Sequence, residues 1–189
     1  MAVAYVYYLG LGSNIEPALH FSTALGKIQA KFGRFMVWPV ITTTPVGIAT
    51  PHPFCNTLVV LRSSWSPSEL KCWTNAIEEG CGRDRSDPAS PDKDRPLDID
   101  ILAQQSQLDF SILEQFKEPY IQAVIAAGQP HEPTMNDLGM SWSVRHVLMV
   151  NGQPLSQRPA TINTQHTAGH IMVVENGVDS LLQRIEPTL

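Results

Sequence analysis

The sequence predicts an α+β fold in which four strands and two helices follow one another in the order strand, helix, strand, strand, helix, strand. Short runs rich in β-branched and aromatic residues alternate with segments whose apolar residues recur at helical spacing. Turn residues separate these runs at intervals typical of compact domains. The chain has 189 residues, of which 43% are hydrophobic. That composition and length predict one globular domain over residues 1–189.

The first strand and the first helix are predicted from the amino-terminal third. Residues 2–11 are rich in β-branched and aromatic side chains, and the turn formers of residues 12–14 end the run. In residues 16–32 the apolar side chains recur at helical spacing. Gly33 follows where a helix often ends in a glycine, so we expect the helix to stop there.

The middle of the chain predicts two neighbouring strands. Residues 34–44 alternate between apolar and polar side chains, and Pro45 ends the run. A loop with proline and glycine spans residues 45–53, and a second strand is expected at residues 54–62. Two successive strands without an intervening helix indicate an α+β fold.

A second helix and a fourth strand complete the predicted core. Ser66, Pro67 and Glu69 form a helix start, with proline in the first turn and an acid placed to cap it. A charged loop spans residues 83–94, and a strand is expected at residues 97–103. The complete order is that of a ferredoxin-like sandwich, in which helices pack on an antiparallel sheet.

The pattern is weaker after residue 105. A helix is predicted at residues 110–129 and a loop at residues 132–141. Strands are expected at residues 144–150 and 170–174, with a polar connection over residues 154–167. We therefore expect a core over residues 1–129 and a C-terminal extension over residues 130–189.

Composition excludes several classes of protein. The net charge of −5 argues against a general nucleic-acid binder, which needs a basic surface. The three cysteines are odd in number and form no C-x-x-C pair, which argues against a disulfide framework or a cysteine zinc site. No apolar run approaches the roughly 20 residues that span a bilayer. We expect a cytoplasmic protein that is a monomer or a weak dimer.

Asp98 and Asp100 are the most informative pair in the sequence. Alternate side chains of a strand share one face, so these two carboxylates point the same way. Hard divalent cations such as magnesium prefer oxygen ligands and leave room for phosphate. The pair is therefore a candidate site for two metal ions. The alternative is an amphipathic strand whose acids face water.

Four basic residues bracket the loop that leads into this pair: Arg83 and Arg85 at its start, Lys93 and Arg95 at its end. Guanidinium groups suit phosphate oxygens, and bases beside metal-binding carboxylates are what phosphoryl transfer requires. The same loop carries acids, so a solvated loop of mixed charge is the alternative. The sequence contains no G-x-x-x-x-G-K-[ST] motif and so no phosphate-binding loop of that kind.

Six short motifs in order resemble those of 6-hydroxymethyl-7,8-dihydropterin pyrophosphokinases. They are Gly12-Ser13-Asn14, Thr43-Thr44-Pro45-Val46-Gly47, Phe54-Cys55-Asn56, Ile77-Glu78, Gly82-Arg83-x-Arg85, and Arg95-Pro96-Leu97-Asp98-Ile99-Asp100-Ile101. The resemblance runs from the first strand to about Leu102. In the place of a Pro-His pair usual in the family, this chain has Pro119-Tyr120.

The resemblance implies a ferredoxin-like fold, two magnesium ions on Asp98 and Asp100, and ATP as co-substrate. The residues that it implies for catalysis are Arg83, Arg95, Asp98 and Asp100. Those implied for ATP binding are Glu78, Arg83, Arg85, Lys93, Arg95, Ile101 and Tyr120. Those implied for pterin binding are Thr44, Pro45, Val46, Phe54, Asn56 and Asp98. An aromatic face and an amide suit a flat heterocycle, although Phe54 could be an ordinary core residue and Asn56 a turn residue.

The implied reaction is an in-line attack of the pterin hydroxyl on the β-phosphorus of ATP, with release of AMP, in folate biosynthesis. The metals and Arg83 would neutralise charge while the loop excludes water. Two alternatives remain open on the sequence. One is a divergent paralogue that acts on or binds another pterin or nucleotide, and the other is a non-catalytic ferredoxin-like binding module.

Overall fold

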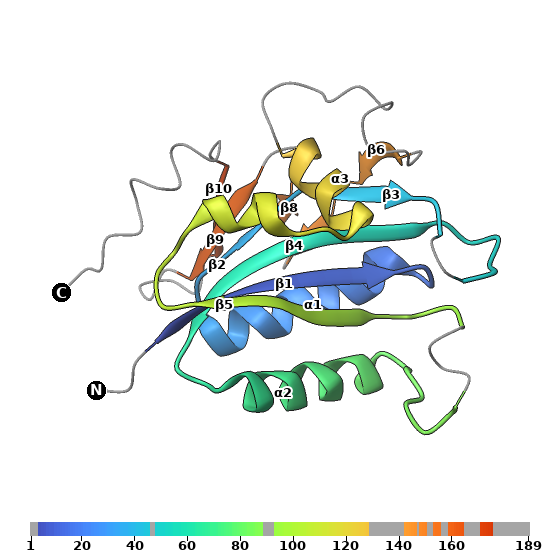
Figure 1. The fold of residues 1–189 in the computed structure, drawn as a ribbon, viewed down its shortest axis with the longest axis horizontal. Helices are drawn as coiled ribbons and strands as arrows, with labels where there is room; N and C mark the ends of the chain where they lie inside the picture. Colours follow the sequence, from blue (N-terminus) through green and yellow to red (C-terminus); the bar gives the residue numbers. More distant parts are fainter. Residues whose placement is uncertain are drawn as a thin grey trace.

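A computed structural model describes residues 4–45, 48–88, 93–128, 142–146, 148–150, 153–155, 159–164 and 171–175. The first half contains β1 (Tyr5–Ser13), α1 (Pro17–Phe32), β2 (Phe35–Val37), β3 (Val40–Thr43), β4 (Phe54–Ser63), α2 (Pro67–Gly80) and β5 (Asp98–Gln105). The second half contains the 3₁₀ helix η2 (Phe110–Gln115), α3 (Pro119–Ala127), β6 (Trp142–His146), β7 (Leu148–Val150), β8 (Gln153–Leu155), β9 (Ala160–Thr164) and β10 (Ile171–Glu175) (Figure 1).

The fold is built on an antiparallel sheet. Its main path runs β10-β9-β2-β4-β1-β5, while β3 pairs with β4 and β6. The core strands β5, β1, β4 and β2 therefore lie in the spatial order fourth, first, third, second. Together with the element order, this arrangement confirms the predicted α+β, ferredoxin-like class.

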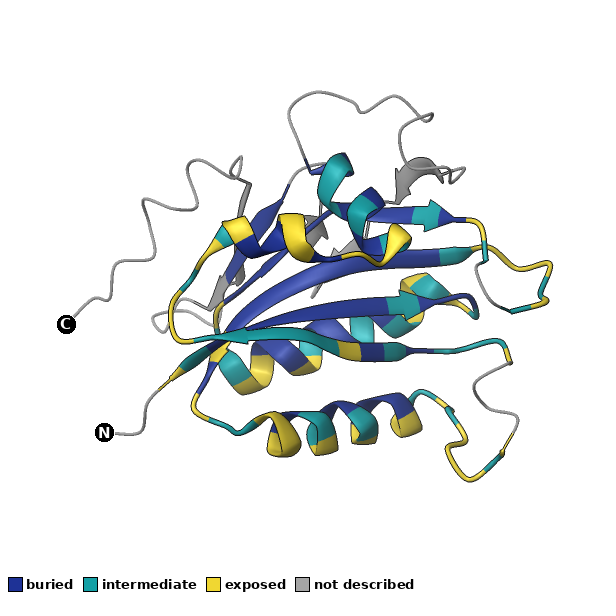
Figure 2. Ribbon diagram, viewed as in Figure 1, coloured by how far each residue is buried: buried dark blue, intermediate teal, exposed yellow. Residues whose placement is uncertain are grey.

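Helices cover both faces of the sheet (Figure 1). On one face, α1 and α2 pack on odd-numbered residues of β1 such as Tyr7, Leu9 and Leu11. On the other face, α3 and η2 pack on even-numbered residues such as Val6 and Tyr8. The central strands are consequently the most deeply buried part of the molecule, which the dark blue ribbon of Figure 2 shows. They give the site a rigid floor.

The strand predicted at residues 34–44 is interrupted. β2 and β3 both pair with β4, β2 opposite residues 59–61 and β3 opposite residues 54–56. Pro39 lies between them and has no N–H to donate to a neighbouring strand. Trp38 still donates its N–H to the carbonyl of Leu58 at 2.9 Å. The predicted strand is thus two short strands on one edge of β4.

The predicted end of α1 and the predicted start of α2 are confirmed. Gly33 has φ of 72°, a conformation that a residue with a Cβ adopts only with strain, and its N–H bonds to the carbonyl of Gln29. At the start of α2, the Ser66 side chain accepts from the N–H of Glu69 and the Glu69 side chain accepts from the N–H of Ser66. This reciprocal capping fixes where α2 begins.

The single helix predicted at residues 110–129 is wrong in its middle. The chain forms η2, leaves the helical conformation at Phe116 and resumes as α3 at Pro119. Proline disfavours a helical residue before it, and Glu118 accordingly has ψ of 117°. The break turns the chain back over the sheet, so that α3 covers β3 and β4.

The C-terminal region contributes more strands than the sequence predicts. The strand expected at residues 144–150 is divided into β6 and β7, and the one expected at residues 170–174 is β10. The supposed polar connection of residues 154–167 contains β9, which pairs with β2 and β10. The loop predicted at residues 132–141 lies outside the described residues. The division into core and extension stays a prediction, but β6, β9 and β10 belong to the same sheet as β1.

None of the helices in the described residues combines the length and the apolar character needed to cross a membrane. All three cysteines are free: Cys55 is buried, Cys81 is half-buried and Cys72 is exposed.

Candidate active site

The candidate site lies on the α3 side of the sheet, where three strands present side chains of one parity. β1 contributes Gly10 and Gly12, and β4 contributes Phe54 and Asn56. β5 contributes Asp98 and Asp100, while its Ile99 and the preceding residue Leu97 are buried in the opposite core. The predicted alternation of this strand is therefore confirmed for its apolar side.

Strand register places these residues in rows. Gly12 lies opposite Asn56 of β4 and also opposite Asp98 of β5. Gly10 lies opposite Asp100, and on the far side of β4 Phe54 lies opposite Thr43. Residues that are more than forty positions apart in sequence thus meet on one surface.

The two glycines leave room above the sheet. A Cβ on Gly12 would lie 3.1 Å from Oδ1 of Asn56 and 3.9 Å from the ring of Phe54. A Cβ on Gly10 would lie 3.1 Å from Ile121 of α3. Glycine inside a strand commonly marks a close approach of another group to the backbone. Here the missing side chains open a cleft between the sheet and α3.

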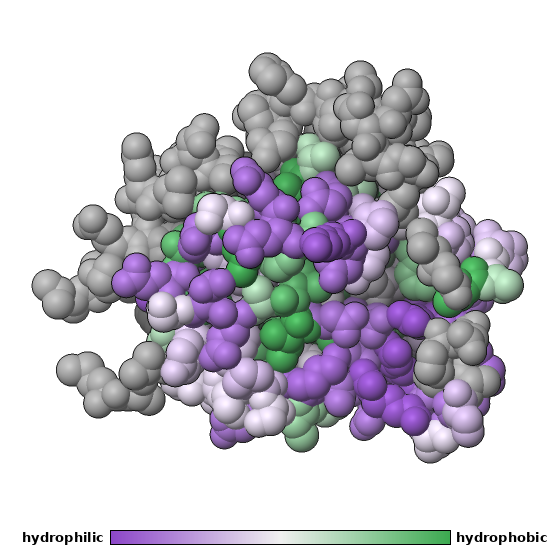
Figure 3. Space-filling view, in the orientation of Figure 1, coloured by the Kyte–Doolittle hydropathy of each residue, from purple (hydrophilic) through white to green (hydrophobic). Residues whose placement is uncertain are grey.

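The cleft has a volume of about 110 Å³ and brings together residues from five segments of the chain. Its described lining consists of Gly10, Gly12, Thr43, Thr44, Ile48, Phe54, Asn56, Arg95, Asp98, Asp100 and Tyr120. On the face that Figure 3 shows, an apolar patch lies over β5, and hydrophilic side chains gather beside it where β5 begins and α2 ends. The cleft therefore joins an apolar side to a charged side.

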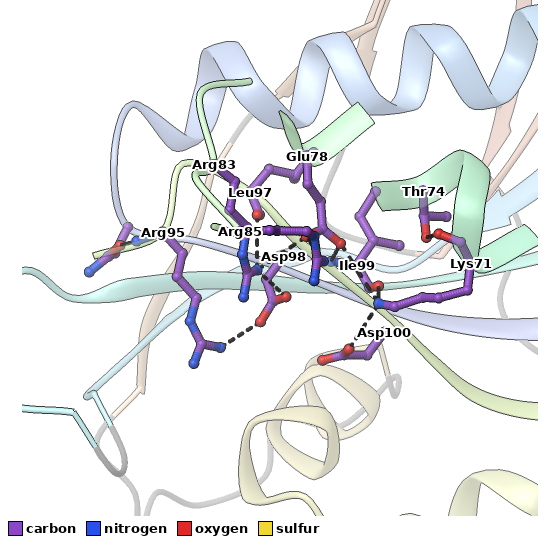
Figure 4. Close-up of polar contacts among 11 residues, drawn as sticks. Lys71, Thr74, Glu78, Arg83, Arg85, Arg95, Leu97, Asp98, Ile99 and Asp100 are labelled. Atoms are coloured by element: carbon purple, nitrogen blue, oxygen red, sulfur yellow. Dashed lines mark hydrogen bonds and ion pairs between the residues drawn. The ribbon is translucent and has the colours of Figure 1, made fainter. Parts of the chain in front are cut away.

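Asp98 is held by two arginines. Nη1 of Arg83 donates to Oδ1 of Asp98, and Nη1 of Arg95 donates to Oδ2 at 2.5 Å (Figure 4). Arg83 also donates to the carbonyl of Leu97 at 3.3 Å. The Asp98 side chain is 14% exposed, so it reaches the cleft without facing bulk water freely. Arg83 lies at the start of the predicted loop and Arg95 at its end.

Glu78 of α2 is fully buried and organises the same group of charges. Its Oε1 accepts from the N–H of Ile99 at 3.0 Å, and its Oε2 contacts Nη1 of Arg83 at 3.2 Å and the guanidinium of Arg85. Burial raises the pKa of Glu78, against the opposing effects of the Ile99 N–H and of the neighbouring cations. In this structure its carboxylate ties α2 to β5 and to the arginine loop.

Asp100 is the more accessible of the two aspartates, with a side chain 51% exposed. Lys71 of α2 reaches past the edge of β5, donates to the carbonyl of Ile99 at 2.6 Å and lies 3.4 Å from Oδ1 of Asp100 (Figure 4). Its Nζ is also 3.8 Å from Oε1 of Glu78. The two aspartates therefore have different cationic neighbours.

Tyr120 forms part of the cleft from the α3 side. Burial raises its pKa to about 12, and the nearby charges of Asp100, Glu118 and Asp98 act in the same direction. Arg95 opposes the shift. The phenol thus stays a neutral hydrogen-bonding group over the whole physiological range.

The structure brings most of the predicted site residues together. Thr44, Phe54, Asn56, Arg95, Asp98, Asp100 and Tyr120 line the cleft, and Arg83 contacts Asp98. Asn56 lies within β4 rather than in a turn, and its Nδ2 donates to the Thr43 hydroxyl at 2.7 Å. Their roles in binding and catalysis stay predictions.

Other predicted residues lie apart from the cleft. Lys93 pairs with Asp87 on the exposed loop, and Ile101 packs against the core shared with α1 and α2. Pro45 is not among the lining residues, and Val46 lies outside the described part of the chain. The prediction that these residues bind substrate gains no geometric support here.

Sequence reasoning missed Gly10, Gly12, Thr43 and Ile48 as lining residues of the cleft, and Lys71 as the partner of Asp100. The two glycines could have been found, because paired glycines of one parity inside a strand signal an open surface. The role of Lys71 could not have been found, because nothing in the sequence indicates which strand edge a helical lysine will contact.

Comparison with known proteins agrees with this geometry. The sequence model of the family "7,8-dihydro-6-hydroxymethylpterin-pyrophosphokinase (HPPK)" matches residues 8–134, which include every lining residue of the cleft. The chain belongs to this family. The family match thus covers β1 to α3, while β6 to β10 lie beyond it.

Relatives of this pyrophosphokinase family point the same way. Two strains of Porphyromonas gingivalis have a 2-amino-4-hydroxy-6-hydroxymethyldihydropteridine pyrophosphokinase that is 39% identical over 99 residues, covering 51% of this chain and 67% of the relative. The enzyme of that name from Bacillus subtilis is 35% identical over 100 residues, covering 51% of this chain and 58% of the relative.

Proposed function

We propose that this chain carries out the reaction for which its family is named, the transfer of a pyrophosphoryl group from ATP to 6-hydroxymethyl-7,8-dihydropterin in folate biosynthesis. The observation that carries the proposal is the cleft itself. A carboxylate held between two guanidinium groups lies in the same cleft as an aromatic ring and a buried amide. A polyphosphate and a flat heterocycle are the two kinds of ligand that such a surface suits.

The charge balance favours a polyanion. Lys71, Arg83, Arg85 and Arg95 are grouped around the three carboxylates of Glu78, Asp98 and Asp100, so cations are in excess. Nε of Arg83 is buried and has no hydrogen-bond partner among the described residues, which leaves a charged donor beside Asp98. Such a donor is costly to leave unpaired, and Arg95, which lines the cleft, is the guanidinium placed to reach a phosphate oxygen.

Magnesium fits the donor set when it arrives with nucleotide. Within the described residues no group of three or more histidine, cysteine, aspartate or glutamate side chains is placed to bind a metal, so phosphate oxygens would complete the coordination of an ion held by two carboxylates. Asp98 and Asp100 offer two carboxylates, and magnesium is usually bound by one or two carboxylates together with substrate phosphates. When bound there, the metal would neutralise charge on the phosphates.

Phe54, Asn56 and Thr44 line the part of the cleft that we assign to the pterin. The ring of Phe54 is half-buried and borders the open space over Gly12. Asn56 is buried, and its contact with the Thr43 hydroxyl fixes the orientation of its amide, so that Oδ1 is left toward Gly12. A fixed amide in a dry pocket recognises the edge of a heterocycle through directional hydrogen bonds.

In the proposed step the pterin hydroxyl oxygen forms a bond to the β-phosphorus, and the bond between that phosphorus and the oxygen bridging to the α-phosphorus breaks. AMP leaves with the bridging oxygen, and the hydroxyl proton is lost to water. Arg83 and Arg95 stabilise the charge that builds on the phosphate oxygens, and Arg95 lines the cleft itself. Tyr120, as a neutral phenol, can donate a hydrogen bond without adding charge.

The test is a turnover assay for AMP, run with and without hydroxymethyl-dihydropterin and magnesium. We expect AMP only when both are present. Asp98→Asn and Asp100→Ala should each lower kcat on the order of a hundredfold or more, because each removes a carboxylate from the metal-phosphate site. Asp87→Ala, an acid of the same loop that pairs with Lys93, is the matched control and should retain activity.

Three results would contradict the proposal. Full turnover by both aspartate variants would remove the carboxylates from the mechanism. Tight binding of ATP and pterin without any AMP release would favour the non-catalytic binding module, and AMP release with a different pterin alone would favour the divergent paralogue.

A further inference from the structure

Helix α2 and strand β5 meet along an open edge of the sheet, because β5 ends the described strand order. At such an edge, every second residue directs its backbone N–H and C=O away from the sheet. Ile99 is the residue of this kind that lies between Asp98 and Asp100. Its outward groups must therefore find partners that are not strands.

Two side chains of α2 bind these groups, one the N–H and the other the carbonyl. Oε1 of Glu78 accepts from the Ile99 N–H at 3.0 Å, and Nζ of Lys71 donates to the Ile99 carbonyl at 2.6 Å. Lys71 and Glu78 are seven residues apart, which is two turns, so they lie on one face of the helix. This arrangement fixes the peptide units on each side of Ile99 and thereby the spacing of the two aspartates.

Lys71 has a second contact that Glu78 lacks. Its ammonium lies 3.4 Å from Oδ1 of Asp100, and it is the cation paired with Asp100 among the described residues. Asp98 has two guanidinium partners instead. The Lys71 side chain is only 35% exposed, so water shields its charge incompletely. At 3.4 Å from Asp100, this charge repels any other cation that binds the same carboxylate.

We propose that Lys71 is a positioning residue that also serves as the resident counter-ion of Asp100, and that it sets how tightly this site takes a divalent cation. The inference rests on the proposed function, which puts a metal at Asp98 and Asp100. The ammonium holds the Ile99 carbonyl throughout and competes with a divalent cation for Asp100. Lys71 neutralises part of the negative charge of Asp100 and so weakens the attraction of this carboxylate for a metal. A metal that arrives with polyphosphate overcomes this competition more readily than a metal alone, because the phosphates add negative charge of their own.

The competing ammonium predicts an effect of unusual sign. If Lys71 acted only as a structural clamp, its removal would loosen β5, misplace the aspartates and weaken cation binding. If it acts as a counter-ion, its removal takes away a like charge beside the metal and strengthens cation binding. The direction of the change therefore separates a clamp that is also a counter-ion from a clamp alone.

The experiment titrates the full-length protein with Mn²⁺ alone and measures free Mn²⁺ by electron paramagnetic resonance at low ionic strength. Lys71→Met and Lys71→Gln should each bind Mn²⁺ roughly three- to tenfold more tightly than the wild type. Glutamine removes the charge but keeps a hydrogen-bond donor, on a side chain one atom shorter, for the Ile99 carbonyl. Lys71→Arg keeps the charge and should stay within about twofold of the wild type.

Lys27→Met is the matched control for net charge. Lys27 lies on α1 and lines a separate groove with Trp73 of α2, so its loss should leave Mn²⁺ affinity within about twofold of the wild type at the same ionic strength. Thermal unfolding of each variant checks that the chain is folded.

Unchanged or weaker Mn²⁺ binding by folded Lys71→Met and Lys71→Gln would overturn the counter-ion role. Asp100→Asn distinguishes that failure from a failure of the proposed function. This variant should bind Mn²⁺ at least about tenfold more weakly than the wild type. An unchanged Mn²⁺ affinity in Asp100→Asn would instead refute the metal site itself.

Discussion

At the scale of single residues, Tyr120 shows how the cleft controls protonation. The phenol lies among carboxylates in a half-buried position, and both burial and the charge of Asp100 favour its neutral form. A pKa raised to about 12 means that the folded protein holds this proton more tightly than the unfolded chain does. The associated stability is complete below the ordinary tyrosine pKa near 10 and is lost as the pH rises toward 12.

We expect this loss to be measurable with Tyr120→Phe. Between pH 9 and pH 11 the wild type should lose about 1 kcal/mol of unfolding free energy relative to the variant, because only the wild type gains a phenolate on unfolding. Urea unfolding at each pH, followed by circular dichroism, gives the difference. A difference that stays flat across this range would show that Tyr120 titrates normally.

At the scale of elements, Asp94 connects two loops to the end of β1. Its Oδ1 accepts from Nδ2 of Asn14 at 2.6 Å, and its Oδ2 lies 2.6 Å from Nδ1 of His52. Asn14 in turn accepts from the N–H of Arg95 at 2.6 Å. Hydrogen bonds from Thr50 and His52 hold the pKa of Asp94 below its usual value, so this carboxylate stays charged. The loop before Phe54 and the loop that carries Arg95 are thus fastened to one point.

Asp94→Ala should release both loops without unfolding the protein. We expect faster amide hydrogen exchange at residues 48–50, at His52 and at residues 93–95, together with a several-fold lower kcat, because Arg95 is held less firmly against Asp98. Removing the half-buried carboxylate also leaves the amide donor of the buried Asn14 without its acceptor, so we expect global stability to fall by about 1–2 kcal/mol.

Asp87→Ala again serves as the control, because it removes an acid of the same loop that pairs with Lys93. Equal exchange in the two variants would show that Asp94 does not fasten the loops.

At the scale of the whole molecule, the C-terminal region contributes to the hydrophobic core of residues 8–134, the part that matches the family model. β9 pairs with β2, and its Ala160 and Ile162 are buried in the core shared with α1 and α2. At the end of α3, a Cβ on Gly128 would lie 2.7 Å from Trp38 and 3.1 Å from Pro159. The segment that the family model leaves out is therefore packed into the same sheet and core.

Ile162→Ala should accordingly destabilise the whole chain by roughly 2–4 kcal/mol, the usual cost of truncating a fully buried aliphatic side chain. Leu19→Ala is a suitable control, because Leu19 is 56% exposed and its truncation should change stability by no more than about 0.5 kcal/mol. Urea unfolding measures both. A loss at Ile162 no larger than that at Leu19 would mean that β9 is not part of the cooperative core.

Local sequence determined the elements that carry their own signals. Ser66 and Glu69, three residues apart, cap α2 through reciprocal hydrogen bonds, and the backbone conformation of Gly33 ends α1. The alternation of residues around Asp98 determines which side chains share a face of the strand. These features depend on contacts within a few residues, so they can be inferred without knowing the fold.

Tertiary structure alone decided what lies beside what. Lys71 gives no sign in the sequence that it will reach Ile99 and Asp100, because the contact exists only once α2 lies along the edge of β5. The burial of Glu78 and the pairing of β9 with β2 likewise depend on strands and helices that are distant in the chain. Long-range packing brings these groups together, and it is this packing that places two aspartates of one strand in a cleft with Arg95 beside them.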